Sequence, residues 1–164
     1  MKRILPLSVL AASAVLLSGC GFTPIYGQTG AGAIGNQLST IDVQTPNDRL
    51  GYRLREQLED AFGRTASTPA QWRLNTEVEQ SRLPLGRRID DTATRYQLTV
   101  KAKWTLTPLN GGQPLSGERT TITTYGSADQ PYAAIAAQQD GEDRAAADLA
   151  RLIRLDLIRA LSSR

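Results

Sequence analysis

The chain of 164 residues carries 19 basic and 16 acidic residues, and it contains a single cysteine and no histidine. The lack of histidine excludes Ser-His-Asp catalysis and removes the commonest metal ligand, and one cysteine cannot form an intramolecular disulfide. This composition predicts one globular domain that binds or assembles rather than an enzyme, with no metal, no bound cofactor and no nucleic-acid partner.

The N-terminus has the pattern of a bacterial lipoprotein signal. Two basic residues precede a nearly wholly apolar segment, residues 4–17, and Leu17-Ser18-Gly19-Cys20 matches the sequence at which lipoproteins are lipidated. The apolar segment is shorter than the roughly 20 residues that a membrane-spanning helix needs. We therefore expect residues 1–19 to be removed and Cys20 to carry the lipid anchor. An ordinary secretory signal with a chance cysteine is the alternative.

The mature protein would differ in charge from the full chain. Loss of Lys2 and Arg3 leaves 17 basic residues against 16 acidic ones, so the net charge is close to neutral. No aspartate follows Cys20, which predicts sorting to the outer membrane, facing the periplasm. Glycines recur through residues 21–37, and we expect residues 20–37 to form a lipidated flexible tether ahead of a single domain over residues 38–164.

The domain begins with a strand and a helix. Residues 38–43 have the composition of a short strand. Thr45, Pro46 and Asp48 fit the start of a helix, with Thr45 as the N-cap. Apolar residues then recur at helical spacing, with Leu54 in the middle of the apolar stripe, and Gly63 is a plausible end. This pattern predicts a helix over residues 46–62.

Three strands follow in a meander. Apolar and polar residues alternate over residues 72–79 and again over residues 94–107, and a threonine-rich strand is expected over residues 118–125. The composition of residues 108–114 predicts the turn between the last two strands. Trp72 and Trp104 fall on the apolar faces and are expected in the core.

The last element is a long helix over residues 132–161, with Gly141 as a point where it could bend or break. Arg151 and Arg154 fall outside its apolar stripe. The resulting order, β-α-β-β-β-α, predicts an α+β fold in which two helices pack on one face of a mixed four-stranded sheet. Acidic residues at 90–91 and 140–143 lack the spacing of a calcium loop and are expected at a turn and near a helix N-terminus.

Two short segments carry a resemblance to a known family. Cys20-Gly21-Phe22-Thr23-Pro24-Ile25-Tyr26-Gly27 resembles the start of mature lipopolysaccharide-assembly lipoproteins of the LptE family, particularly the alphaproteobacterial ones. Asp91-Thr92-Ala93-Thr94-Arg95-Tyr96 resembles the entry to that family's long strand, and the order of elements is similar. The resemblance implies an outer-membrane lipoprotein that plugs the LptD β-barrel, assists its assembly and helps deliver lipopolysaccharide to the cell surface.

Lipopolysaccharide carries phosphates and acidic sugars, which arginine binds through charge-assisted hydrogen bonds. Within that resemblance, the expected lipopolysaccharide-binding residues are Arg87 and Arg88, before the long strand, and the same-face row of Arg95, Lys101 and Lys103. A solvated strand face, with lysines that discourage edge pairing, is the alternative for the row. The alternative for the whole chain is a periplasm-facing lipoprotein of another envelope lipid-transport or secretion system.

Overall fold

The computed structural model describes residues 31–87, 93–127 and 129–163. The chain divides into two units, Met1–Ala33 and Ile34–Arg164, and the fold described below is that of the second unit. The expected signal, the lipid-bearing Cys20 and the first part of the expected tether lie outside the described residues.

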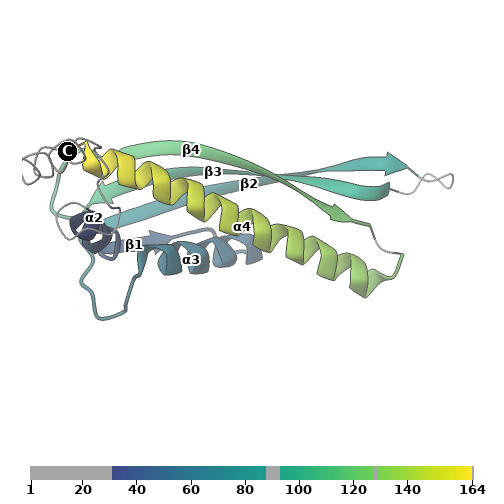
Figure 1. The fold of residues 1–164 in the computed structure, drawn as a ribbon, viewed down its shortest axis with the longest axis horizontal. Coiled ribbons are helices and arrows are strands. Elements are labelled where there is room, and N and C mark those ends of the chain that lie inside the picture. The colour runs from purple at the N-terminus through teal and green to yellow at the C-terminus, as the bar shows by residue number, and fades with distance from the viewer. Residues whose placement is uncertain (1–30, 88–92, 128, 164) are drawn as a thin grey trace, which may run out of the picture. The chain divides into compact units, whose positions relative to one another are not determined.

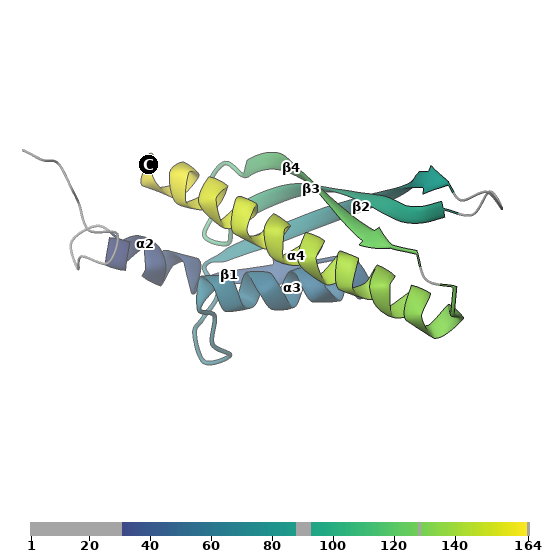
Figure 2. The same ribbon diagram turned by 45° about the vertical axis from the view of Figure 1, so that its right-hand side comes forward.

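The described residues form an α+β fold, as predicted. Its elements are α2 (Ala31–Leu38), β1 (Ile41–Gln44), α3 (Arg49–Phe62), β2 (Trp72–Arg87), β3 (Ala93–Pro108), β4 (Leu115–Gly126) and α4 (Pro131–Ser162). The sheet has the order β1-β2-β3-β4, with β1 parallel to β2 and the other pairs antiparallel. Helices α3 and α4 lie on the same face of this mixed sheet (Figures 1 and 2).

Helix α2 covers residues 31–37, which the glycine-rich composition placed in the tether. The predicted strand at residues 38–43 therefore begins later, at Ile41. The hydroxyl groups of Ser39 and Thr40 donate to the carbonyl oxygens of Asn36 and Gln37, which satisfies backbone acceptors at the end of the helix. Leu38 is buried as the last residue of α2 rather than as the first residue of a strand.

Helix α3 starts at a different residue from the one predicted. Asp48, not Thr45, is the N-cap: its backbone is extended and its carboxylate accepts a hydrogen bond of 2.6 Å from the backbone N–H of Gly51. A Cβ at Gly51 would lie only 2.2 Å from the carbonyl oxygen of Pro46, so this start depends on glycine there. Gly63 ends the helix in the left-handed conformation, as predicted.

The core lies between the sheet and the two helices. Leu54 and Leu58 of α3, Leu74 of β2, and Leu149 and Ile153 of α4 are fully buried there. Trp104 is buried as predicted, whereas Trp72 is partly buried and packs against the edge of the core. The alternation of apolar and polar residues along the strands thus leaves one face of the sheet covered and the other open.

Helix α4 continues through Gly141 without a break. The ring of Tyr125 on β4 lies against this residue, since a Cβ at Gly141 would be 3.0 Å from the Cδ1 atom of Tyr125. The glycine therefore allows close packing of helix on sheet rather than a bend. No residue of α4 before Gly141 is buried, and this end of the helix diverges from the outer ends of β2 and β3 (Figures 1 and 2).

Candidate functional site

The predicted cationic residues are spread along the β2–β3 hairpin, with Arg87 and Arg95 near its outer end and Lys101 and Lys103 in its middle. Strand β2 extends to Arg87, eight residues past its predicted end, so Arg87 pairs with Ala93 in the β2–β3 ladder instead of lying in a link. Gly86 has a φ of 67°, a left-handed conformation that suits glycine beside the end of the strand. Arg88 lies outside the described residues.

The row of Arg95, Lys101 and Lys103 occupies the open face of β3, but its two lysines have acidic neighbours. The ammonium group of Lys101 lies 3.0 Å from a carboxylate oxygen of Glu118 on β4, and that of Lys103 lies 3.9 Å from Glu79 on β2. Cross-strand pairing in the sheet brings these charges together. The middle of the open face is therefore a ladder of opposite charges, not an uninterrupted cationic strip.

Arg95 differs from the lysines because it forms no ion pair with the described residues. It is exposed and lies opposite Leu85 on β2 and Gly126 on β4. Two large apolar side chains of the same face, Leu83 and Ile122, are 56% and 60% exposed in the rows between Arg95 and the charge ladder. We call this surface, made of Leu83, Leu85, Arg95 and Ile122, the hairpin surface; it combines positive charge with exposed apolar groups.

A second cation, Arg82, lies on the helix-covered face of β2. Its Nη1 group donates to the Oε1 atom of Gln138 on α4 at 2.8 Å and to the hydroxyl oxygen of Tyr125 at 3.3 Å. Its guanidinium group is 5.4 Å from the ring centroid of Tyr96, which itself stacks on Tyr125. The hydrogen bond to Tyr125 raises the pKa of Arg82.

The acidic residues near the middle of α4 serve helix packing. Glu142 is buried and lies 2.7 Å from Arg49 of α3, while Gln138 donates to its second carboxylate oxygen at 2.9 Å. Asp143 pairs with Arg49 at 3.0 Å, and Asp140 pairs with Arg144. The described ranges contain no group of three or more residues that could hold a metal ion.

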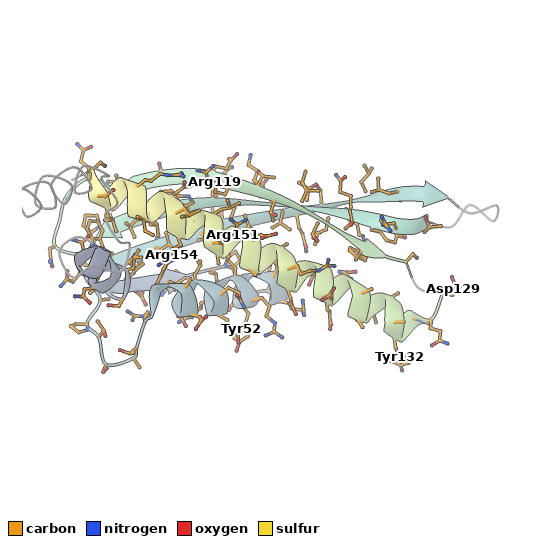
Figure 3. The ribbon with its side chains drawn as sticks, viewed as in Figure 1. Tyr52, Arg119, Asp129, Tyr132, Arg151 and Arg154 are labelled. Carbon is orange, nitrogen blue, oxygen red and sulfur yellow. The ribbon has the colours of Figure 1, made fainter. Side chains whose placement is uncertain are left out.

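Further along α4, arginines connect the elements. Arg119 of β4 forms a two-pronged ion pair with Asp156 on α4. Figure 3 labels Arg119, Arg151 and Arg154 beside the C-terminal half of α4. Arg151 is exposed, as its position outside the apolar stripe predicted, but Arg154 donates to the carbonyl oxygen of Ala61 at 3.0 Å. Arg154 therefore contacts the C-terminal end of α3 and is not free on the outer face of α4.

The fold and the sequence both match known proteins. The model of the LptE family, described as lipopolysaccharide-assembly, matches residues 38–157. A putative lipoprotein from Caulobacter crescentus CB15 is 42% identical over 80% of this chain and 96% of its own length, with a TM-score of 0.69. No curated protein matches the chain.

Two other solved structures are more distant. Rare lipoprotein B from Shewanella oneidensis is 15% identical with a TM-score of 0.45, and the match covers 75% of this chain and 93% of that one. Lipoprotein B from Nitrosomonas europaea is 12% identical with a TM-score of 0.47, covering 70% and 78% of the two chains.

Membership of a family is decided by the family model and by the Caulobacter crescentus lipoprotein. Within the described residues, no helix combines the length and the apolar character needed to cross a bilayer. The family itself is one of non-enzymatic envelope lipoproteins without a bound cofactor. Because the family model matches most of the chain and the sequence predicted the same relationship, this protein belongs to the LptE family of lipopolysaccharide-assembly lipoproteins.

Proposed function

We propose that this chain is anchored in the outer membrane through lipid on Cys20 and sits as a plug within the LptD β-barrel. In this role it assists assembly of the barrel and helps deliver lipopolysaccharide to the cell surface, without catalysing a reaction. The polar open face of the sheet supports the proposal, since the interiors of such barrels are polar. The charge ladder of Glu79, Lys101, Lys103 and Glu118 would present hydrogen-bonding groups of both signs to the barrel wall.

The observation that carries the lipopolysaccharide part of the proposal is the hairpin surface. Lipopolysaccharide is an amphiphile with negatively charged phosphates beside its acyl chains. The hairpin surface offers Arg95, which has no acidic partner among the described residues, next to the exposed side chains of Leu83 and Ile122. Arg87 ends the same hairpin and Arg88 follows it in sequence. We propose Arg87, Arg88 and Arg95 as the residues that contact phosphate, with Lys101 and Lys103 in a secondary role.

Purification of the native complex tests the barrel partner. A tagged copy of the full-length chain would be isolated from outer membranes solubilised in mild detergent, and its stable partners identified by mass spectrometry. The proposal expects a stoichiometric complex with the large LptD barrel. Recovery with the components of another envelope transport or secretion system, and no barrel, would contradict it.

The charge ladder offers a sharper version of the same experiment. If the open face lies against the barrel wall, Lys101→Glu combined with Lys103→Glu should reduce recovery of the barrel while the isolated protein remains folded. The matched control is Arg55→Glu combined with Arg151→Glu, which makes the same change in charge at exposed positions on the helices. Equal loss from both pairs would show that the open face has no particular part in the complex.

A further inference from the structure

Arginine side chains in the described part of the chain are mostly occupied by acidic partners. Ion pairs to carboxylates are made by Arg49, Arg53, Arg55, Arg64, Arg73, Arg119, Arg144, Arg151 and Arg159. Among the arginines whose side chains the structure describes, which do not include Arg87, the exceptions are Arg82, Arg95 and Arg154. Arg154 donates to the carbonyl oxygen of Ala61, and Arg95 belongs to the hairpin surface. Arg82 is the remaining arginine of this group, and it forms no ion pair with a described carboxylate.

The guanidinium group of Arg82 is held in place but not neutralised. Both of its hydrogen bonds, to Gln138 and Tyr125, use the same nitrogen, Nη1, and both acceptors are uncharged. Among the described residues, its Nε and Nη2 groups have no acceptor. The central carbon of the guanidinium group lies over the ring of Tyr96, 5.4 Å from its centroid. Two donors of the planar group are thus free in the arrangement that binds an oxyanion with two parallel hydrogen bonds.

A groove gives access to this side chain. It has a volume of about 220 Å³ and is lined by Gln80, Ser81, Arg82, Leu98, Tyr125 and Gln138. A neighbouring groove of about 380 Å³ shares Gln80 and Gln138 and reaches Ile135, which is 54% exposed. Both grooves lie beside the part of α4 around Gln138, close to Gly141, and the second also reaches the start of α3. Together they have the size of a small-molecule site. Their linings combine two cations, Arg82 and Arg49, with amides, apolar groups and the carboxylates of Asp48 and Glu142. Those two carboxylates are already engaged, Glu142 by Arg49 and Asp48 by the backbone N–H of Gly51.

We propose that this groove binds the phosphate group of a phosphorylated amphiphile, with Arg82 as its main ligand. The Nε and Nη2 groups of Arg82 would donate to phosphate oxygens, and the hydroxyl of Tyr125, which accepts from Nη1, would donate to the same phosphate. The amide of Gln138 holds Arg82 in place and is itself hydrogen-bonded to Glu142. Leu98 and Ile135 would contact the adjacent apolar part of the amphiphile. The inference rests on the proposed function in that such a protein meets phosphorylated lipids, and it adds a site on the opposite face of the sheet from Arg95.

Calorimetric titration of the full-length chain in a neutral detergent tests the site. The probes are a short-chain phosphatidic acid, the diacylglycerol of the same chain length, and inorganic phosphate. We expect phosphatidic acid to bind, diacylglycerol not to bind, and inorganic phosphate to bind more weakly. Equal affinity for inorganic phosphate and phosphatidic acid would overturn the assignment to an amphiphile.

Two substitutions of Arg82 locate the binding. Arg82→Gln should weaken binding of phosphatidic acid by about tenfold or more, because it removes charge-assisted hydrogen bonds. Arg82→Lys keeps the charge but loses the planar pair of donors, so it should also bind more weakly, and it decides the matter if Arg82→Gln fails to fold. Arg151→Gln is the matched control, since it removes one positive charge from an exposed position of α4 and should bind normally. Normal binding by the Arg82 variants, or equal loss in the control, would overturn the site.

Variants of the hairpin arginines distinguish binding in the groove from the proposed contact between the hairpin and lipopolysaccharide. Arg87→Gln combined with Arg88→Gln should leave the affinity for phosphatidic acid unchanged while it weakens binding of lipopolysaccharide. If that double variant alone lost both ligands, the groove would not be a site, although the proposed function would stand. If only the Arg82 variants lost phosphatidic acid and the hairpin variant bound lipopolysaccharide normally, the groove would stand and the proposed role of the hairpin would fall.

Discussion

Single residues show how closely neighbouring strands of the sheet fit together. The indole of Trp104 on β3 lies over Gly117 on β4, where a Cβ would come within 2.5 Å of the ring. The tryptophan is buried, and its Nε1 group has no hydrogen-bond partner among the described residues. Glycine at position 117 is therefore required by the ring opposite it, and not by a turn or an unusual backbone conformation.

The substitution Gly117→Ala tests this contact. The added methyl group must push the indole aside in a close-packed core, so we expect a loss of about 1–3 kcal/mol in the free energy of unfolding, together with a shift in tryptophan fluorescence. Urea denaturation measures the first quantity. Gly126→Ala is the control, because a Cβ there would meet nothing within 4 Å. Equal stability of the two variants would show that Trp104 does not lie over Gly117.

The buried face of α3 gives a second prediction. Leu54 is fully buried, and Leu54→Asp should reduce the free energy of unfolding by several kcal/mol because an unpaired carboxylate would enter the core. Arg53 is partly exposed and pairs with Glu56, so Arg53→Ala should melt close to the unmodified protein. Similar melting temperatures for the two variants would refute this orientation of the helix.

The elements show which parts of the fold the sequence can predict. The order of strands and helices, the mixed sheet and the helix-covered face follow from the periodicities of β3, α3 and α4, which are long and regular. The outer half of β2 was missed because Pro84 and Gly86 interrupt its pattern. Strand β1 pairs only with residues 72–75, so the outer part of β2 is an edge that tolerates both residues.

The start of α3 shows why a boundary is harder to predict than an element. Thr45 and Asp48 both fit the pattern of an N-cap, and the hydrogen bond from the backbone N–H of Gly51 to the carboxylate of Asp48 distinguishes them only in the folded structure. We predict that Asp48→Ala lowers the free energy of unfolding by about 1 kcal/mol, while Thr45→Ala has little effect. Thermal or urea denaturation distinguishes the two, and a larger loss for Thr45→Ala would restore the predicted cap.

Only part of the candidate site could be predicted from the sequence. The position of Arg95, Lys101 and Lys103 on one face follows from strand alternation, but their acidic partners depend on the register between strands. In the sequence, nothing distinguishes Arg82 from the other basic residues of this region. Its role depends on Tyr96, Tyr125 and Gln138, which come from three other elements, and no local pattern links them.

At the scale of the whole molecule, membrane attachment depends on the N-terminal segment. The sequence predicts lipid on Cys20, and the described residues contain no helix suited to span a bilayer. We predict that Cys20→Ala leaves the domain folded but releases it from the membrane fraction in cells that lack the barrel partner. Fractionation followed by immunoblotting measures this. A variant that remained wholly in the outer membrane of such cells would show that lipid on Cys20 is not the main attachment.

The central proposal for this protein is that the cationic end of the β2–β3 hairpin binds lipopolysaccharide. The direct measurement is the affinity of the purified full-length chain for lipopolysaccharide at two salt concentrations, with Arg87→Glu combined with Arg88→Glu. We predict binding weaker by roughly tenfold or more, with a smaller effect at high salt, because each arginine–phosphate contact contributes modestly and reversal of its sign adds repulsion. Arg55→Glu combined with Arg151→Glu, the same change in charge on the two helices, should bind normally. Equal loss from both pairs, or loss from the helix pair alone, would contradict the claim.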